Sequence, residues 1–455
     1  MFLGLDDIEA NHQEAALWFT KAANQGDPKA LNDLGNMHNY GIYFEKNTEI
    51  AIDFYRQATE AGSDAGKCNY GWALIKSNND TVKNEGLQLL KSAANNGYIQ
   101  AQLNLGRIYL GDYGFEIDHQ QCFHYFKAAA DQENPEGLTS LGVNYSRGYG
   151  CERNQEKANE LYKMAAEKGD AQAQFNLAWS YHYGTGVEHD LDEAFQYYLM
   201  AAEQGHPGGF RGVGQMYEVG TEKSPQNLEQ AAKFYHLAAE QGDEVAEYNL
   251  GVFYQYGTGV ELNLDTAVKY LERAAIKDDP SANLNLGLLY QEGINSERDY
   301  SKALYYFERA THLAHPKAAG CIGFLYMNGF GLEQNTSKAM EFFEKSASMG
   351  DVHSQYNLGL LYKKIERNEP NIKNACYWFL TAADQNFGAA QIDSSIMLIN
   401  SEDEENKVEA VKWAILGKIN GDDRADNLLK YIDDHISEEI INEGASRADK
   451  FYEGN

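Results

Sequence analysis

The stretch Ala246-Glu247-Tyr248-Asn249-Leu250-Gly251-Val252-Phe253-Tyr254-Gln255-Tyr256-Gly257 decides the fold, because its central motif returns throughout the chain. The small residue that ends the Asn-Leu-Gly motif recurs in steps of 35, 36 or 37 residues, and a degenerate copy ends at Ser395. A period of this length is typical of a repeat array. The ten clear copies place this small residue at Gly35, Gly71, Gly106, Gly142, Ala178, Gly214, Gly251, Gly287, Gly323 and Gly359.

Each repeat has the hydrophobic spacing of two helices. In the quoted copy, a first helix (helix A) has its small and apolar residues at the i, i+4, i+5, i+8 spacing of one helix face, from Ala246 to Tyr254. A second helix (helix B) follows, with the i, i+3, i+4, i+7 spacing from Ala267 to Ala274. Because small residues at fixed positions let neighbouring helices approach closely, we expect each pair to pack as a hairpin.

These patterns predict an all-α fold: a right-handed α–α superhelix (solenoid) of about eleven 36-residue helix–turn–helix repeats with a C-terminal helical cap. We expect a partial N-terminal repeat with an orphan helix B in residues 1–26, the repeat array in residues 27–421 and the cap in residues 422–455. Residues 1–10 are either a minimal N-terminal cap or the remainder of a trimmed N-terminus. A C-terminal cap is expected because the last repeat would otherwise expose its stacking face. Within it, Ser437 is predicted to begin a helix whose apolar stripe includes Ile441, Ala448 and Phe451.

Glycine marks the turns of each repeat. Positions just after helix B, such as Gly169 and Gly205, suit a left-handed C-terminal turn, and Asn134 and Asn386 are expected to replace glycine there. The connection from A to B often reads Gly-x-Gly-Val, as in 184–187. A phosphate-binding loop would follow a strand and occur once, so the pattern favours a tight turn between helices.

The combination of A-x-x-x-L-G-x-x-Y, G-x-G-V and A-A-x-x-G-[DN] resembles the Sel-1-like repeat family, a relative of the tetratricopeptide repeat. The resemblance covers roughly residues 11–421 and implies a helical solenoid that binds other proteins. The cysteine-rich members of that family have paired cysteines. The five cysteines of this chain are widely separated and odd in number, so we expect free thiols.

Composition excludes several function classes. The 455 residues have a net charge of −30, which disfavours nucleic-acid binding and attachment to anionic membranes. We expect no membrane insertion, because no run approaches the length of about 18 apolar residues that a membrane helix needs. The sequence as written has no secretory signal, so we expect a cytoplasmic protein, or a periplasmic or secreted one if the N-terminus is trimmed.

No catalytic constellation stands outside the repeat pattern. The nearest match to a phosphate loop, 62–68, has the wrong glycine spacing and a cysteine where a hydroxyl residue belongs. The histidines are scattered. The two close pairs, His119 with His124 and His312 with His315, have no clear third metal ligand nearby in the sequence. We therefore predict no enzymatic activity, no cofactor and no metal.

A column of asparagines lies two residues before the motif residue. In the related tetratricopeptide fold, a carboxamide at this position of helix A holds a peptide backbone, since it both donates and accepts hydrogen bonds. The structural alternative is that these side chains link neighbouring A helices. The candidates are Asn69, Asn104, Asn176, Asn249, Asn285 and Asn357.

Five further residues break the repeat pattern on the side where a groove is expected. Trp72, Arg107 and Trp179 lie one position after the motif residue, His182 lies four after it and Arg211 three before it. Aromatic and arginine side chains are frequent anchors of protein interfaces, although surface variation or packing would also explain them.

The predicted function is a protein–protein interaction scaffold or adaptor that binds a partner protein or peptide on the concave face of the solenoid, of the bacterial virulence or regulatory kind. One alternative is an immunity or inhibitor protein that neutralises a cognate basic toxin or enzyme, as its acidic surface suggests. The other is a module that binds glycan or peptidoglycan through aromatic side chains. The oligomeric state stays open.

Overall fold

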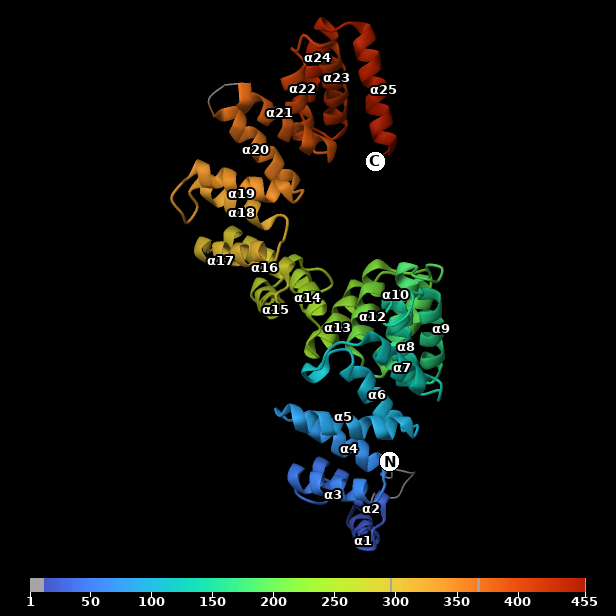
Figure 1. The fold of residues 1–455 in the computed structure, drawn as a ribbon. Helices are drawn as coiled ribbons and strands as arrows, with labels where there is room; N and C mark the ends of the chain where they lie inside the picture. Colours follow the sequence, from blue (N-terminus) through green and yellow to red (C-terminus); the bar gives the residue numbers. More distant parts are fainter. Residues whose placement is uncertain (1–11, 295–296, 366–368, 455) are drawn as a thin grey trace. The chain divides into compact units, whose positions relative to one another are not determined.

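The computed structural model describes residues 12–294, 297–365 and 369–454, which form 25 α-helices, one short 3-10 helix and no β-strand beyond a single bridge between Ile294 and Glu297. The chain divides into two compact units, Met1–Asp243 and Glu244–Asn455, and each is a stack of helical hairpins (Figure 1). This is the all-α solenoid that the repeat pattern predicts.

The first unit begins with a single helix, followed by six hairpins in which the even-numbered helix is helix A and the odd-numbered one is helix B. Its elements are α1 (His12–Ala23), α2 (Pro28–Tyr40), α3 (Thr48–Glu60), α4 (Asp64–Ile75), α5 (Asp80–Asn95), α6 (Ile99–Ile108), η1 (Asp112–Gly114), α7 (His119–Ala130), α8 (Pro135–Arg147), α9 (Gln155–Glu167), α10 (Ala171–Tyr183), α11 (Leu191–Glu203), α12 (Pro207–Val219) and α13 (Leu228–Glu240). Residues 1–10, where a minimal cap was an option, lie outside the described residues.

The second unit continues the same alternation through five hairpins and ends with two further helices. Its elements are α14 (Glu244–Tyr256), α15 (Leu264–Ile276), α16 (Pro280–Glu292), α17 (Tyr300–His312), α18 (Ala318–Asn328), α19 (Thr336–Ser348), α20 (Val352–Lys364), α21 (Glu369–Asp384), α22 (Gly388–Leu398), α23 (Glu404–Ile419), α24 (Ala425–His435) and α25 (Glu438–Gly454). Helix α25 lies alongside α23 (Figure 1), where Phe451 packs edge-on against the buried Trp413 ring at a centroid distance of 5.5 Å.

The motif glycine sets the distance between the two helices of a hairpin. A Cβ atom at Gly142 would lie 2.6 Å from Cε1 of Tyr162 in helix B, and one at Gly359 would lie 2.7 Å from Cδ1 of Phe379. The ring of helix B therefore fills the space that a side chain would occupy. This contact explains why the column accepts only glycine, alanine or serine.

Parallel aromatic rings join the last turn of helix A to helix B in several hairpins. Tyr181 and Tyr197 stack with ring centroids 5.9 Å apart and planes within 5°, and Tyr290 and Tyr306 stack at 5.7 Å and 2°. Offset stacking of this kind adds about 0.5–1.5 kcal/mol beyond the burial of apolar area. The bulky columns of the sequence thus stabilise each hairpin in the same way.

A ladder of buried carboxamides links consecutive hairpins, and the sequence analysis did not identify it. Gln174 in α10 donates from Nε2 to the Ala166 carbonyl of the preceding helix B, and its Oε1 accepts from Gln204 Nε2 at 2.8 Å. The arrangement recurs at Gln102 with Gln132 and at Gln355 with Gln385. Because buried polar groups are costly when unpaired, the ladder constrains how these hairpins pack on the ones before them.

The turn after helix B is left-handed, with one correction to the sequence prediction. Asn386 adopts φ +63° as expected, but in the corresponding turn near residue 134 the left-handed residue is Glu133, at φ +58°. Asn134 instead caps α8, because its Oδ1 accepts a hydrogen bond from the Gly137 amide at 2.9 Å. An N-cap requires this acceptor at the position before the helix, so the asparagine belongs to the helix start.

The Gly-x-Gly connection is a tight turn between helices, as predicted. Gly184 ends α10 at φ +62°, and Gly186 follows at φ +70°. A Cβ atom on Gly186 would lie 2.9 Å from the backbone carbon of Gln155 at the start of α9. The loop therefore packs on the preceding hairpin and leaves no room for a phosphate at that glycine.

Candidate functional site

The first unit contains a groove of about 270 Å³ that brings together three of the predicted binding residues, Asn176, Trp179 and Arg211. Its walls come from the A helices α8, α10 and α12, with contributions from α9 and α11. We call it the A-helix groove. It is lined by Val143, Ser146, Arg147, Gln155, Tyr162, Phe175, Asn176, Trp179, Ser180, Tyr183, Tyr198, Arg211 and Gln215.

Glycines on α12 make the groove possible. A Cβ atom at Gly208 would lie 2.7 Å from the Phe175 ring, and one at Gly212 would collide with the Tyr198 ring. Position 212 belongs to the column that holds asparagine in other repeats. The missing side chains leave room for the two rings, whose surfaces then line the groove.

Trp179 and Tyr183 form the exposed aromatic edge of the groove. Their side chains are one turn apart on α10, are 44% and 55% exposed, and lie with ring centroids 4.9 Å apart. His182 stacks on the Tyr183 ring at 4.3 Å, and its Nδ1 lies 3.4 Å from the Tyr198 hydroxyl. His182 therefore supports the aromatic edge from behind and does not itself line the groove.

The two arginines of the groove are each held against an aromatic ring. The guanidinium carbon of Arg211 lies 5.8 Å from the Phe175 ring, and its Nε is 3.3 Å from Oδ2 of Asp243. The guanidinium carbon of Arg147 lies 5.8 Å from the Tyr149 ring, at the end of α8. Contact with a ring face limits the freedom of the guanidinium and so prepares it to receive a planar anion.

Polar groups with unused hydrogen-bonding capacity lie between the aromatic and the cationic parts. Asn176 Oδ1 accepts from Gln172 Nε2 at 2.9 Å, which leaves the Asn176 amide hydrogens to donate into the groove. Gln155 Oε1 accepts from the Ser146 hydroxyl at 3.0 Å. Carboxamides held in this way suit a peptide backbone, which offers both donors and acceptors.

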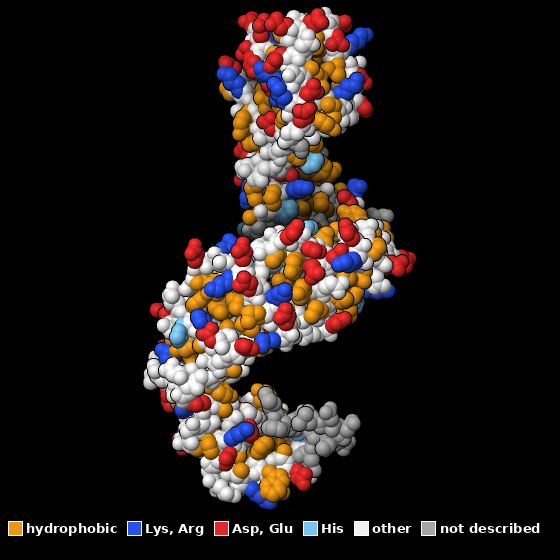
Figure 2. Space-filling view, turned by 90° about the vertical axis from the view of Figure 1, so that its right-hand side faces the viewer, with side chains coloured by type: hydrophobic (Ala, Val, Ile, Leu, Met, Phe, Trp, Pro, Cys, Tyr) orange, Lys and Arg blue, Asp and Glu red, His pale blue; other side chains and the backbone are white. Residues whose placement is uncertain are grey.

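Among the described residues that line the groove, Arg147 and Arg211 are the only ones of the Asp, Glu, Lys, Arg or His types. Burial raises the pKa of Tyr162 to about 12 and also raises the pKa of Tyr198. Burial lowers the pKa of the neighbouring His182, with a smaller contribution from His189. The residues that line the groove include no carboxylate, although acidic side chains are spread over the visible face of the molecule (Figure 2).

Three residues of the predicted asparagine column make contacts between neighbouring A helices. Asn69 donates to Asn32 Oδ1 at 2.8 Å, Asn104 Nδ2 lies 3.6 Å from the Cys68 sulfur, and Asn285 Nδ2 lies 3.4 Å from the Tyr248 hydroxyl. These contacts are the ones expected if the asparagines link neighbouring A helices. Two further members of the column, both half-buried in the second unit, are Asn249 and Asn357.

Trp72 and Arg107 lie in the first unit outside the groove. The Trp72 ring is half-buried and meets the Tyr113 ring edge-on at 5.1 Å. Arg107 is exposed and forms an ion pair with Glu136. The structure therefore does not bring these two residues together with Trp179 and Arg211.

Sequence reasoning identified three of the thirteen residues that line the groove, and among those it missed are Arg147, Phe175 and Tyr183. Tyr183 lies four residues after Trp179 and Arg147 four residues after Val143, so both share a helix face with a groove residue. This spacing could have indicated Tyr183 and Arg147 from the sequence. No sequence pattern indicates Phe175, because its ring lines the groove only where the next A helix has glycines.

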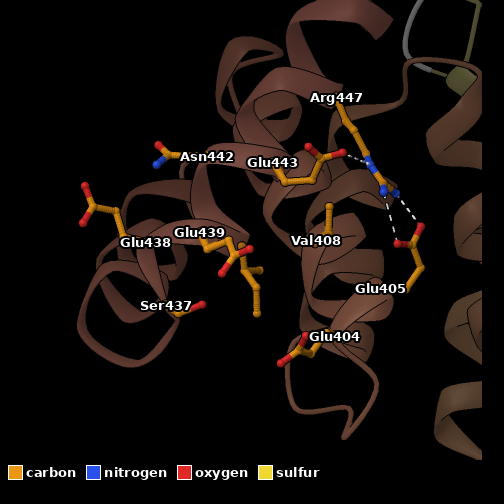
Figure 3. Close-up of a pocket in the computed structure, with 10 residues that line it drawn as sticks. Glu404, Glu405, Val408, Ser437, Glu438, Glu439, Asn442, Glu443 and Arg447 are labelled. Atoms are coloured by element: carbon orange, nitrogen blue, oxygen red, sulfur yellow. Dashed lines mark hydrogen bonds and ion pairs between the residues drawn. The ribbon is translucent and has the colours of Figure 1, made fainter.

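A second hollow, of about 770 Å³, lies between α23 and α25 in the second unit (Figure 3). Five glutamates line it, and its one basic residue, Arg447, already binds three carboxylates: Glu405, Glu409 and Glu443. The pairing ties α25 to α23. A cluster of this kind has few apolar contacts to offer, so the A-helix groove is the stronger candidate.

Comparison with known proteins identifies the repeat. The family model described as Sel1 repeat matches eleven segments: 1–27, 28–63, 70–98, 99–134, 135–170, 171–206, 211–243, 245–279, 280–315, 320–351 and 352–387. Among curated proteins, the chain is 35% identical over 103 residues to an F-box protein of Arabidopsis thaliana, a match that covers 22% of this chain and 28% of that protein. It is 28% identical over 134 residues to the human protein sel-1 homolog 2, covering 27% of this chain and 20% of that protein. The chain thus spans less than a third of the length of either relative.

Two solved structures are similar over most of the chain. The protein c5321, a protective antigen of uropathogenic Escherichia coli with an SLR fold, is 24% identical with a TM-score of 0.74, and the match covers 96% of this chain and 94% of that one. A Sel1 repeat protein from Oxalobacter formigenes is 24% identical with a TM-score of 0.50, covering 70% of this chain and 91% of that one. At this identity the likeness shows the fold.

Proposed function

Since the chain belongs to the Sel1 repeat family, whose members generally mediate protein–protein interactions, we propose that it is a scaffold or adaptor that binds a segment of a partner protein in the A-helix groove. The observation that carries the proposal is the exposed aromatic edge of Trp179 and Tyr183 above unsatisfied carboxamide and guanidinium groups. Interfaces are enriched in these residue types, and a hollow gives them water-excluded contact. A bacterial regulatory or virulence role is the narrower form of this proposal.

The proposal predicts binding without catalysis. The described residues that line the groove include no nucleophile paired with a base. No helix in the described part of the chain has the length and apolar character needed to cross a membrane.

Site-specific photo-crosslinking tests the proposal. A photoreactive amino acid placed at position 183 is expected to crosslink to one partner in cells, and Trp179→Ala should abolish the crosslink without loss of helicity. Tyr256 gives a matched control, because it occupies the same repeat position in α14 and is 67% exposed but lies outside the groove. Equal crosslinking from positions 183 and 256, or no effect of Trp179→Ala, would contradict binding in the groove.

A second candidate, neutralisation of a cognate basic toxin or enzyme, is favoured by the net charge of −30. Such a partner would be steered to acidic surfaces, and its association rate would fall steeply with added salt. A crosslinked partner that is basic and binds the Trp179→Ala variant as well as the unmodified chain would favour this candidate over the groove.

A further inference from the structure

The charge of the A-helix groove is opposite to that of the chain. The chain has 68 acidic and 38 basic side chains, yet the residues that line the groove include Arg147 and Arg211 and no Asp or Glu. The aromatic rings beside these guanidinium groups are less polarisable than water, so an anion that covers the groove is attracted more strongly than it would be on an open surface.

Arg147 has no acidic partner among the described residues. Its Nη1 lies 3.5 Å from the Tyr149 hydroxyl, and the guanidinium rests near the same ring. Most of its hydrogen-bond donors therefore face solvent. An incoming carboxylate would gain two parallel charge-assisted hydrogen bonds, the geometry in which arginine binds most strongly.

Arg211 is fixed more firmly. Asp243 contacts it at Nε, and Asp243 does not line the groove. The side chain of Arg211 is 25% exposed and lies against Phe175. Its two terminal nitrogens have no hydrogen-bond acceptor within the described part of the chain, so the same guanidinium can hold Asp243 on one edge and a ligand anion on the other.

The aromatic part of the groove fits one large apolar side chain. The whole A-helix groove has a volume of about 270 Å³, below the range of about 300–1,000 Å³ that is usual for small-molecule pockets. Trp179, Tyr183 and Tyr198 provide ring surfaces beside the two arginines, and Asn176 can donate to a backbone carbonyl between them. The groove is therefore suited to a short extended segment with an apolar anchor and not to a small metabolite.

We infer that the occupant is an acidic segment of another protein, in which an Asp or Glu stands within a few residues of an aromatic or large aliphatic side chain. The inference rests on the proposed function and specifies its ligand. A lysine or arginine of a partner would meet two guanidinium groups and no carboxylate among the residues that line the groove, and repulsion between like charges disfavours it. The acidic exterior therefore favours basic partner surfaces, whereas the cationic groove favours an acidic segment.

Selection from a random 12-residue peptide display library against the full chain tests the inference. The expected peptides carry Asp or Glu close to Phe, Trp, Tyr, Leu or Ile, and lose binding to the Trp179→Ala/Tyr183→Ala variant. Arg147→Gln should weaken the selected peptide about tenfold, because a hydrogen bond to a charged group is worth roughly that factor or more.

Arg153 is the matched control. It is exposed, lies in the loop six residues after Arg147 and does not line the groove, so Arg153→Gln removes the same charge and should leave the affinity within about twofold. In the reverse test, Arg147→Glu should reject the selected peptide and bind the peptide whose Asp or Glu is replaced by Lys. Circular dichroism of each variant confirms that folding is retained.

The outcomes separate the two proposals. Peptides that depend on Trp179 and Tyr183 but lack an acidic residue, or that tolerate Arg147→Gln as well as Arg153→Gln, would overturn the acidic-segment inference and leave groove binding intact. Peptides that bind the Trp179→Ala/Tyr183→Ala variant equally well would contradict groove binding itself. A library that yields only basic peptides, or none that depends on the groove, would also overturn the inference.

Discussion

The Lys277 ammonium lies 2.7 Å from the buried carboxylate of Glu247, in the place where other repeats join two glutamines. Glu247 is four residues before its motif glycine, as Gln174 is before Ala178, and Lys277 follows helix B as Gln204 does. Arg273 binds the other carboxylate oxygen at 2.9 Å. One repeat has therefore replaced a neutral link of the ladder with an ionic one.

Glu247→Ala is expected to destabilise the second unit by about 3 kcal/mol, because it removes a buried carboxylate that Arg273 and Lys277 both bind. The double variant Glu247→Gln/Lys277→Gln should recover most of that loss by forming the carboxamide link found at Gln174. Denaturant unfolding of the single and double variants measures the coupling. Additive losses for Glu247→Gln and Lys277→Gln would show that position 247 does not take part in the ladder.

Gly186→Ala is expected to cost more than Gly205→Ala, although both glycines have positive φ, +70° and +80°. At Gly205 a Cβ atom meets nothing within 4 Å, so the cost is the backbone strain of about 1–2 kcal/mol. At Gly186 the same atom lies 2.9 Å from the backbone of Gln155, and α9 must shift. Thermal denaturation of both variants checks the order; equal midpoints would exclude close packing of the turn on α9.

His206 makes the stability of α12 depend on pH. Its Nδ1 accepts the Gly209 amide at 3.2 Å as an N-cap, and burial lowers its pKa below the usual 6.5, with Arg211 contributing in the same direction. Between the pKa of His206 in the folded chain and its higher pKa in the unfolded chain, the unfolded chain binds more protons. The contribution of His206 to folding stability is therefore complete above about pH 6.5 and is lost as the pH falls through the lowered pKa. His206→Asn keeps an acceptor that does not titrate, as Asn134 does for α8.

We expect His206→Asn to reduce the fall in melting temperature between pH 7.5 and pH 5.5. The variant and the unmodified chain should differ little at pH 7.5, because both then have a neutral N-cap acceptor. Thermal scans at the two pH values provide the measurement, with His189→Asn, an exposed histidine on a neighbouring turn, as the control. Identical pH dependence in all three proteins would show that the cap does not titrate in this range.

Asp393 stands where other repeats have the asparagine of the motif, and it is buried between two cations. Burial alone would raise the pKa of its carboxyl, but hydrogen bonds from Lys363 and Arg424, both at 2.8 Å, bring the pKa below its usual value. The contribution of Asp393 to folding stability is therefore present above about pH 4 and is lost as the pH falls through its lowered pKa. Asp393→Asn should destabilise the C-terminal hairpin by about 3 kcal/mol at neutral pH, as measured by denaturant unfolding.

The fold was predictable because its causes are local and repeated. Gly251, Ala267 and Ala274 recur in register, and each copy reports the same contact between adjacent helices. The carboxamide ladder recurs too, but Gln102, Gln174 and Gln355 occupy their position in only some repeats, and other residues fill it elsewhere. An intermittent column gives a weak signal even where its members are fully buried.

The candidate site was predictable only in part. Trp179 and Arg211 depart from the repeat pattern and could therefore be identified from the sequence. The groove that joins them forms because Gly208 and Gly212 have no side chain where the Phe175 and Tyr198 rings lie. A missing side chain has no signature in the sequence until the opposing ring is known. Position 133 gives the converse case, since a left-handed glutamate is too uncommon to be preferred over the asparagine beside it.

The carboxamide ladder also has a consequence for how such a chain can change in length. Where a rung is present, as at Gln102, Gln174 and Gln355, it joins one hairpin to the next through the same three groups, so excising a module bounded by two such rungs exposes faces that are complementary to each other. Whole modules can then be lost or duplicated with a new seam chemically identical to the old one, whereas indels of any other size would place unlike partners opposite each other. Evolution can in this way lengthen the array around an unchanged binding module.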